Sequence, residues 1–371
     1  MLKQSDIAPY LLERKLISTQ VIVESDLVVK DISGRNHNFA IISEYGPSYL
    51  LKQGIDQEKR ATIAHEAAMY RLLYEETEQS GLKSYLPHCY GYNSEEHILI
   101  LELLRDGQSL REYHAMRGRV SLPLARMLGE ALAMVHRVTK RTSERDEAEW
   151  RLDNQPPWIL SLHRPGLDVY QQVSSAHIQL IQRVQSMPEI ARHFDILRSN
   201  WIADTLIHCD MKWDNCIVFA RPGSKRKSRL LIIDWELAAW GDPCWDIASV
   251  FSDYLSFWVF SMPMTRETSA EQAFELARCP LENVQQGLYA FWQMYVKRME
   301  LSSETADIWL MRTLGYTAAK LVQTAFERTQ FSQQLTSSIE ALLHLSSHII
   351  EQPLEMVVDL LGFPLRQLPV P

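Results

Sequence analysis

Two features that define common protein classes are missing from this sequence: closely spaced cysteine pairs and long apolar segments. The five cysteines lie at positions 89, 209, 216, 244 and 279, and their odd number and wide spacing predict neither a disulfide framework nor a zinc site. No run of about 18 uncharged apolar residues occurs, as a membrane-spanning helix needs, and the N-terminus shows no signal-peptide pattern. We therefore expect a cytoplasmic protein with no membrane partner.

An excess of basic charge is also missing. The chain carries 38 Lys and Arg residues against 46 Asp and Glu residues, a formal net charge of −8. Because a surface that binds nucleic acid must neutralise phosphates with basic side chains, we expect no nucleic-acid partner. With 371 residues, 46% of them hydrophobic, the chain is long enough to bury a sizeable core in one or two domains.

Hydrophobic patterns predict an α+β fold in which a small antiparallel sheet precedes a mainly helical region. The apolar spacing in residues 1–20 predicts a leading helix packed on the sheet. Short β-branched segments predict strands at 20–32, 39–44, 48–52, 86–92 and 98–103, with a helix at 57–79 between the third and the fourth. Beyond residue 109 the pattern is helical, with helices expected at 122–138, 171–186, 190–201, 247–260, 281–301, 304–330 and 335–361.

The polar residues whose spacing most needs a chemical explanation lie between Leu206 and Asp246. The apolar run 230–233 predicts a buried strand that ends at Asp234, and Asn215 precedes another run, 216–219, that can pair with it as a hairpin. Asp210 stands five residues before Asn215. Phosphoryl transfer from ATP needs one carboxylate to orient the attacking hydroxyl and oxygen ligands to hold Mg²⁺, and these three side chains supply that set.

These residues also fit a known pattern. His208, Asp210 and Asn215 match H-x-D-x-x-x-x-N, and Asp234 opens D-W-E where protein kinases have D-F-G. The sequence here resembles the aminoglycoside phosphotransferase and choline kinase branch of the protein-kinase-like superfamily, in which G-D-P and a further Asp follow, as they do at Gly241, Asp242, Pro243 and Asp246. Cys209 departs from the pattern, because Gly or Arg usually precedes the aspartate of this loop.

The resemblance implies a bilobal, protein-kinase-like fold. It divides the chain into an ATP-binding N-lobe at 1–104 and a helical C-lobe at 105–371, with a catalytic loop at 206–219 and a metal strand at 230–246. It also implies the roles of the site residues: Asp210 as catalytic base, His208 as support of its loop, Asn215 and Asp234 as Mg²⁺ ligands, Lys52 as the lysine on the ATP phosphates and Glu66 as its partner. Asp242 and Asp246 are expected to brace this region.

Two further contacts with ATP follow from the resemblance. Glu102 and Leu103 occupy the hinge between lobes, where the backbone would bind the adenine edge, although a plain sheet edge describes them equally well. The turn 33–39 stands where kinases have a Gly-rich loop over the phosphates, but it holds one glycine instead of three. Arg35 and Asn36 are its candidate phosphate donors, and a polar hairpin turn is an equally good account.

The phosphate acceptor is indicated only by short local likenesses. The segments R-N-H-N-F, L-L-K-Q and D-M-K-W-D-N look similar to kinases that phosphorylate Ser/Thr of precursor peptides in class V lanthipeptide and thioamitide biosynthesis. That resemblance implies a peptide substrate and a partner lyase that eliminates the phosphate. Two alternatives stay open: a small-molecule kinase acting on an aminoglycoside, choline or homoserine-like acceptor, and a pseudokinase scaffold that binds a partner protein.

Overall fold

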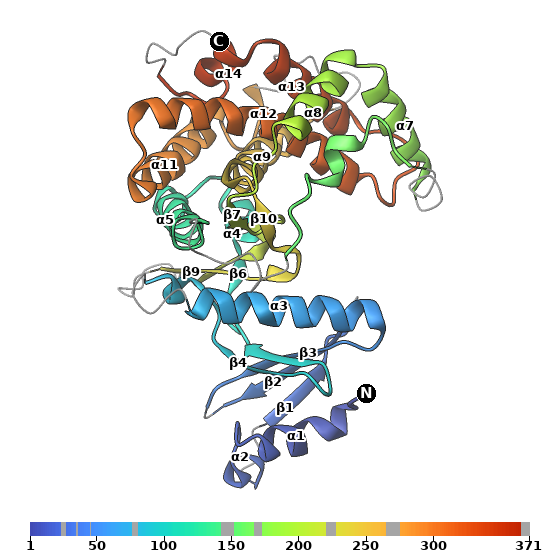
Figure 1. The fold of residues 1–371 in the computed structure, drawn as a ribbon, viewed down its shortest axis with the longest axis vertical. Coiled ribbons are helices and arrows are strands. Elements are labelled where there is room, and N and C mark those ends of the chain that lie inside the picture. The colour runs from blue at the N-terminus through green and yellow to red at the C-terminus, as the bar shows by residue number, and fades with distance from the viewer. Residues whose placement is uncertain are drawn as a thin grey trace. The chain divides into compact units, whose positions relative to one another are not determined.

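The computed structural model describes residues 1–23, 27–34, 36–44, 46–75, 81–141, 152–166, 173–219, 228–264 and 275–364. The chain forms two compact units (Figure 1). The first contains Met1–Ser109 and Asn215–Ala238, and the second contains Leu110–Asp214 and Ala239–Pro371. The predicted α+β class is confirmed, with an antiparallel sheet in the first unit and mainly helices in the second. The lobe boundary at residue 104 stays a prediction.

The first unit is built on a five-stranded antiparallel sheet of order β1-β2-β3-β5-β4. The strands are β1 (Leu27–Asp31), β2 (His37–Ser43), β3 (Tyr49–Gln53), β4 (Cys89–Asn93) and β5 (Ile98–Glu102). Alternate side chains of a strand point to opposite faces. One face packs on the leading helix α1 (Ile7–Glu13), where Tyr10 and Leu11 meet Phe39, Tyr49 and Leu51.

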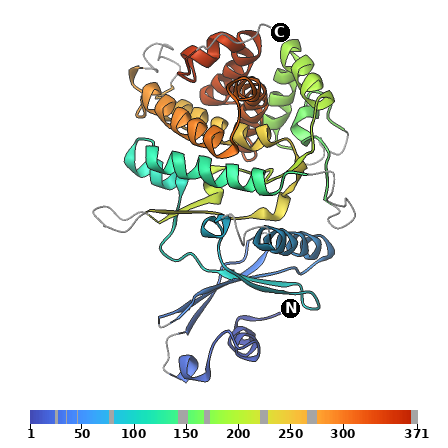
Figure 2. The ribbon, with the colours of Figure 1, turned by 60° about the vertical axis from the view of Figure 1, so that its left-hand side comes forward.

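The other face of the sheet lies against α3 (Gln57–Glu75), as Figures 1 and 2 both show. The predicted strand at 20–32 is wrong in its first part, because Thr19–Val23 forms the short helix α2. The pairing of β1 with β2 ends at Leu27, opposite Ser43, so it does not reach the β-branched residues 21–23. Of the predicted helix 57–79, residues 76–79 lie outside the part that the structure describes.

A three-stranded sheet completes the first unit. It consists of β6 (Gln108–Ser109), β8 (Cys216–Phe219) and β9 (Arg229–Ile232), in the order β6-β8-β9. Strands β8 and β9 pair antiparallel with Cys216 opposite Ile232, so the predicted hairpin is confirmed.

Both units also contain short 3-10 helices. In chain order, these are η1 (Gln4–Asp6), η2 (Leu82–Tyr85), η3 (Trp158–Ser161), η4 (Trp213–Asn215) and η5 (Trp235–Leu237).

The second unit is mainly helical, with one small sheet formed by β7 (Thr205–Ile207) and β10 (Ala239–Gly241). Its helices are α4 (Leu110–Arg117), α5 (Leu122–Val138), α7 (Ser175–Gln185), α8 (Pro188–Ser199), α9 (Pro243–Ser261), α11 (Leu281–Met299), α12 (Ser303–Arg328), α13 (Ser337–Glu351) and α14 (Pro353–Asp359). Helix α9 is buried along nearly its whole length and packs against α11 and α12. Among the described residues, no helix is long and apolar enough to cross a membrane.

Two details of the helical unit have clear local causes. Helices α5 and α11 lie side by side (Figure 2), and a Cβ atom at Gly129 would stand 2.4 Å from the carbonyl oxygen of Phe291; only glycine permits this approach. The single helix predicted at 335–361 is wrong. Gln352 has non-helical dihedrals of −132° and 54°, because the proline ring of Pro353 disfavours a helical residue before it.

Candidate functional site

In the first unit, Lys52 is held between two carboxylates. Its Nζ lies 2.9 Å from both oxygens of Glu66 and 3.3 Å from Oδ1 of Asp234. Lys52 comes from β3, Glu66 from α3 and Asp234 from the end of the β8–β9 hairpin. The structure therefore brings together three of the predicted site residues from separate parts of the sequence.

The charge state of Lys52 follows from these contacts. Burial on its own lowers the pKa of the Lys52 ammonium, but the charges of Glu66 and Asp234 outweigh it and raise the pKa above its ordinary value. Glu66 is fully buried. Lys52 thus remains a fixed cation at neutral pH, which is the property needed to bind phosphate oxygens.

Replacing Glu66 by glutamine should lower the free energy of unfolding by about 3 kcal/mol, because a buried ammonium is left with less compensating charge. Urea unfolding of the wild type and the variant measures the difference. The double variant Lys52→Met with Glu66→Leu should recover most of the loss, since two apolar side chains of similar volume need no charge partner. A single variant as stable as the wild type would contradict this account.

The orientation of Asp234 depends on unusual backbone geometry. Its φ of 68° and ψ of 57° lie in the left-handed region, which Asp and Asn adopt more readily than most residues. The backbone amide of Ile233 donates to the carbonyl of Asn215 at 3.0 Å. Asn215 and Asp234 therefore stand at the same end of the β8–β9 hairpin, as the sequence predicted.

The donors at this end of the hairpin fit a magnesium ion. Asp234 offers a carboxylate that is about one-third exposed, and Asn215 offers an amide oxygen. Mg²⁺ is usually held by one or two protein oxygen ligands together with substrate phosphates and waters. No cluster of three or more His, Cys, Asp or Glu side chains suited to a metal occurs in the described ranges.

The turn between β1 and β2 is partly described. Arg35 lies outside the described residues, and Asn36 accepts at its carbonyl from the Gly34 amide at 3.1 Å. The side-chain oxygens of Asn36 and Asn38 are buried, and neither has a hydrogen-bond partner in the described part of the chain. Asn38 pairs directly with Lys52 across β2 and β3, so both side chains point to the same face of the sheet. The phosphate role of this turn stays a prediction.

The residues after β5 already have backbone partners. The Leu103 amide donates to the carbonyl of Ser48 at 2.9 Å, and its carbonyl accepts from the Arg105 amide at 3.1 Å. The Glu102 side chain accepts from the His88 amide at 3.0 Å. A carbonyl oxygen has two lone pairs, so an adenine contact by Leu103 would use the second lone pair of its carbonyl. That contact also stays a prediction.

In the second unit, the loop that carries Asp210 is braced from below by Asp246. One oxygen of the buried Asp246 accepts from the His208 amide at 2.7 Å, and the other accepts from the Cys209 amide at 3.1 Å. His136 Nε2 lies 3.3 Å from the same carboxylate. Asp242 caps α9 by accepting from the Cys244 amide at 3.0 Å. The predicted bracing roles of both aspartates are therefore confirmed.

Cys209 shows why glycine is common at its position. Its φ of 65° is left-handed, a conformation that glycine adopts without steric cost. Its carbonyl accepts from the ammonium of Lys320 at 3.2 Å, and Lys320 Nζ also lies 4.0 Å from the centre of the Trp245 ring. Burial lowers the pKa of Lys320, while Asp210 and Asp246 act in the opposite direction. Lys320 thus supports the loop from α12.

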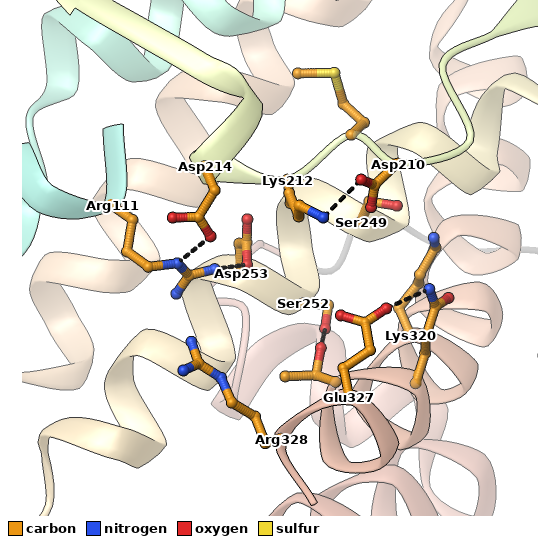
Figure 3. Close-up of a pocket in the computed structure, with 13 residues that line it drawn as sticks. Arg111, Asp210, Lys212, Asp214, Ser249, Ser252, Asp253, Lys320, Glu327 and Arg328 are labelled. Carbon is orange, nitrogen blue, oxygen red and sulfur yellow. Dashed lines mark hydrogen bonds and ion pairs between the residues drawn. The ribbon is translucent and has the colours of Figure 1, made fainter. Parts of the chain in front are cut away.

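Asp210 faces a cavity of about 380 Å³ within the second unit (Figure 3). Charged residues of both signs line it: Arg111, Asp210, Lys212, Asp214, Asp253, Lys320, Glu327 and Arg328. We call it the acceptor cavity. Lys212 Nζ lies 2.6 Å from Oδ2 of Asp210. An ammonium at this distance fixes the direction of the carboxylate that is the predicted base.

A second ion-pair group stands on the opposite wall of the acceptor cavity (Figure 3). Arg111 donates to Asp214 at 2.7 Å and to Asp253 at 2.5 Å, and Asp253 also accepts from the backbone amide of Trp213. Asp253 is buried in α9. This arginine therefore connects α4, α9 and the loop that follows Asp210.

Sequence reasoning missed Arg111, Lys320 and the structural role of Asp253. The sequence did contain a signal for Asp253 and one for Lys320. Asp253 interrupts the most apolar segment of the chain, and Lys320 lies in the apolar run Y-T-A-A-K-L-V. A charged residue inside an apolar helix is buried and therefore needs a partner. Arg111 gave no such signal, because its partners are 103 and 142 residues away.

His114 packs against Trp213, which follows Asp210 in the chain. The imidazole of His114 carries no charge at neutral pH. Its ring is fully buried, lies 4.5 Å from the Trp213 ring centre, and accepts at Nε2 from the Ser121 amide. Burial, with smaller contributions from Arg117 and Arg111, lowers the pKa of His114 to about 3.

Stability should therefore depend on pH through His114. The unfolded chain, with a histidine pKa of about 6.5, binds a proton below that pH, whereas the folded chain does not until about pH 3. The contribution is complete above pH 6.5 and should fall by about 1.4 kcal/mol per pH unit below it. Unfolding free energies at pH 7, 6 and 5 measure the slope, and His114→Gln should reduce it. An unchanged slope in that variant would contradict the prediction.

Comparison with known proteins agrees with this geometry. The structure of choline kinase from Cryptosporidium parvum Iowa II superposes with a TM-score of 0.55 at 13% identity, covering 96% of this chain and 98% of that one. A complex of APH(2")-IIia with GDP and kanamycin superposes with a TM-score of 0.50 at 16% identity, covering 92% and 98% of the two chains. These likenesses show a shared fold. A search of curated proteins gave no match.

The family itself is shown by sequence. Residues 28–279, more than half of the chain, match the phosphotransferase enzyme family. This range includes every site residue described above except Lys320, Glu327 and Arg328 of α12. The resemblance to the aminoglycoside phosphotransferase and choline kinase branch is thereby confirmed, and the chain belongs to the phosphotransferase enzyme family, as a kinase that acts on hydroxyl acceptors.

Proposed function

We propose that this kinase moves the γ-phosphoryl group of ATP, with Mg²⁺, to Ser or Thr hydroxyls of a biosynthetic precursor peptide, before a partner lyase eliminates the phosphate. The main support for ATP as the phosphoryl donor is the triad of Lys52, Glu66 and Asp234. Lys52 Nζ lies 2.9 Å from Oε1 of Glu66 and 3.3 Å from Oδ1 of Asp234. A buried, permanently charged lysine beside a carboxylate suited to a metal supports binding of nucleotide phosphates. The GDP in the APH(2")-IIia complex also favours a nucleotide donor.

In the proposed reaction, the acceptor oxygen forms a bond to the γ-phosphorus as the bond from that phosphorus to the bridging oxygen of ADP breaks. Asp210 orients the hydroxyl and takes its proton. Lys52 holds the α and β phosphates, and Asn215 and Asp234 are the protein ligands of Mg²⁺, which offsets negative charge on the phosphate oxygens when bound. Lys212 Nζ, at 2.6 Å from Oδ2 of Asp210, holds the carboxylate of the base in a fixed direction.

The acceptor cavity favours a peptide over the cationic alternatives. Three of the four described carboxylates in its wall are in ion pairs: Asp214 and Asp253 with Arg111, and Asp210 with Lys212. The fourth, Glu327, accepts from the Gln323 side-chain amide at 2.8 Å. A polycationic aminoglycoside needs several unpaired carboxylates and choline an aromatic cage, and no aromatic side chain is among the described residues that line this cavity. We propose a cytoplasmic location as well, which the five free thiols support.

Mass spectrometry can test the acceptor. The protein and Mg-ATP are incubated in three parallel reactions, one with a Ser/Thr-rich peptide, one with choline and one with kanamycin. Each acceptor is then examined for one added phosphoryl group. A phosphorylated peptide that lyase treatment converts to a dehydrated residue supports the proposal. Phosphorylation of kanamycin or choline alone would refute the peptide acceptor and favour a small-molecule kinase. No product and no thermal shift with Mg-ATP would favour the scaffold alternative.

A further inference from the structure

A second cavity, of about 320 Å³, adjoins the acceptor cavity and shares Arg111 and Arg328 with it. Its walls combine two kinds of side chain. Phe257, Phe260 and Cys279 are apolar, and Arg111, Arg278 and Arg328 are basic. Within the described parts of the chain, no Asp or Glu lines it. We call it the arginine cavity, and in a protein with a net charge of −8 its composition requires an explanation.

Of the three arginines that line the arginine cavity, only Arg111 is in an ion pair within the described part of the chain. Arg111 is satisfied by Asp214 and Asp253. Arg328, in the last turn of α12, lies over the Phe260 ring at 5.4 Å from its centre. Neither Arg328 nor Arg278 has a carboxylate within ion-pair distance among the described residues. Among the described residues, these two exposed guanidinium groups therefore line a partly apolar cavity with no carboxylate beside them.

We propose that the arginine cavity binds an acidic side chain of the acceptor peptide, close to the hydroxyl that is phosphorylated. This inference rests on the peptide acceptor proposed above. Guanidinium groups form strong charge-assisted hydrogen bonds with carboxylates, and Phe257 and Phe260 provide contact for the methylene groups of a glutamate. Because Arg111 and Arg328 line both cavities, an acidic side chain bound here would lie next to the cavity that Asp210 faces.

The same arrangement opposes cationic acceptors. An amine placed here would meet the positive charges of Arg278 and Arg328, whose side chains are exposed at this cavity. The arginine cavity thus gives the kinase a means to distinguish peptides by charge, through attraction of acidic sequences and repulsion of basic ones.

Paired peptides test the inference directly. Peptides with a Ser flanked by Glu, by Gln or by Lys are compared as substrates of the wild type and of the Arg278→Gln and Arg328→Gln variants. The Glu peptide should have a KM about tenfold lower than the Gln peptide, as expected for one charge-assisted pair. Either variant should remove most of that difference, and Arg278→Gln, at a residue that does not line the acceptor cavity, should do so with little change in kcat. Arg183→Gln on α7, where Arg183 pairs with Glu340 at 3.4 Å, is the matched control and should retain it.

A binding experiment separates this inference from the peptide acceptor itself. 3-Phenylpropanoate and 3-phenylpropylamine are titrated into the wild type and both variants, with binding followed by NMR. The carboxylate should bind the wild type about tenfold more tightly than either variant, and the amine should bind none of them measurably. If no peptide is phosphorylated, this titration still decides whether the arginine cavity binds a carboxylate, whereas the peptide acceptor itself is refuted. Equal binding of the carboxylate to all proteins, or peptide phosphorylation with no preference for Glu, would overturn it.

Discussion

Asp210→Asn should leave the kinase folded and able to bind ATP while lowering kcat by about two to four orders of magnitude, the usual contribution of a general base. Asparagine has the shape of aspartate but cannot accept the hydroxyl proton. The loop should keep its conformation, because the amides of His208 and Cys209 remain bonded to Asp246. Lys212 loses its ion pair with Asp210 but stays partly exposed to water, so the structural cost is small.

The measurement pairs a phosphate-transfer assay with ATP titration by calorimetry. Asp307→Asn is the matched control: it neutralises a carboxylate on α12 that lines neither described cavity and has no side-chain partner in the described residues. The control should be as active as the wild type. Retained turnover by Asp210→Asn would remove Asp210 from the role of base, and lost ATP affinity would show that it acts in nucleotide binding instead.

Asp234→Asn should lower activity about as much as Asp210→Asn does, but through loss of a metal ligand instead of loss of the base. We expect kcat/KM to fall by about three orders of magnitude, because a metal bound at the phosphates contributes several kcal/mol to stabilising the transition state. An amide at this position is a weaker ligand than a carboxylate and carries no charge. Lys52 should remain in place, since Glu66 holds it with both oxygens.

Magnesium dependence distinguishes this effect from general damage. In the wild type, adding Mg²⁺ should strengthen ATP binding, and in Asp234→Asn that strengthening should disappear. Glu95→Gln is the control, because Glu95 is an exposed carboxylate of the β4–β5 turn in the same unit. An Mg²⁺ effect that persists unchanged in Asp234→Asn would exclude Asp234 as a ligand.

The elements that sequence predicted best are those whose pattern is set locally. Helix α5 spans Leu122–Val138 as predicted, since its apolar spacing and Pro123 near its start define it without tertiary information. The pairing of β8 and β9 was predictable for a similar reason, because two short apolar runs lie close together in the sequence, separated by a basic segment. Lys52 and Glu66 were paired by resemblance to a family, and the structure shows their contact at 2.9 Å.

Features that depend on distant neighbours were not predictable. Residues 21–23 of α2 are β-branched like strand residues, and only the register of β1 and β2, which ends at Leu27 and Ser43, shows that this pairing does not reach them. The triad of Arg111, Asp214 and Asp253 joins residues up to 142 positions apart. Arg328 and Arg278 looked like ordinary surface arginines, and their common cavity is apparent only once α9 and α12 are folded.

The way the chain divides between its two units has a consequence for modularity. Residues Asn215–Ala238 belong to the same unit as Met1–Ser109, so a fragment that ends at Ser109 would lack β8, the partner of β6, and Lys52 would lose Asp234. Recombination at a single crossover point therefore cannot transfer an intact nucleotide-binding unit between kinases of this kind. Swapping that unit, by evolution or by design, requires the hairpin to travel with it as a second exchanged segment.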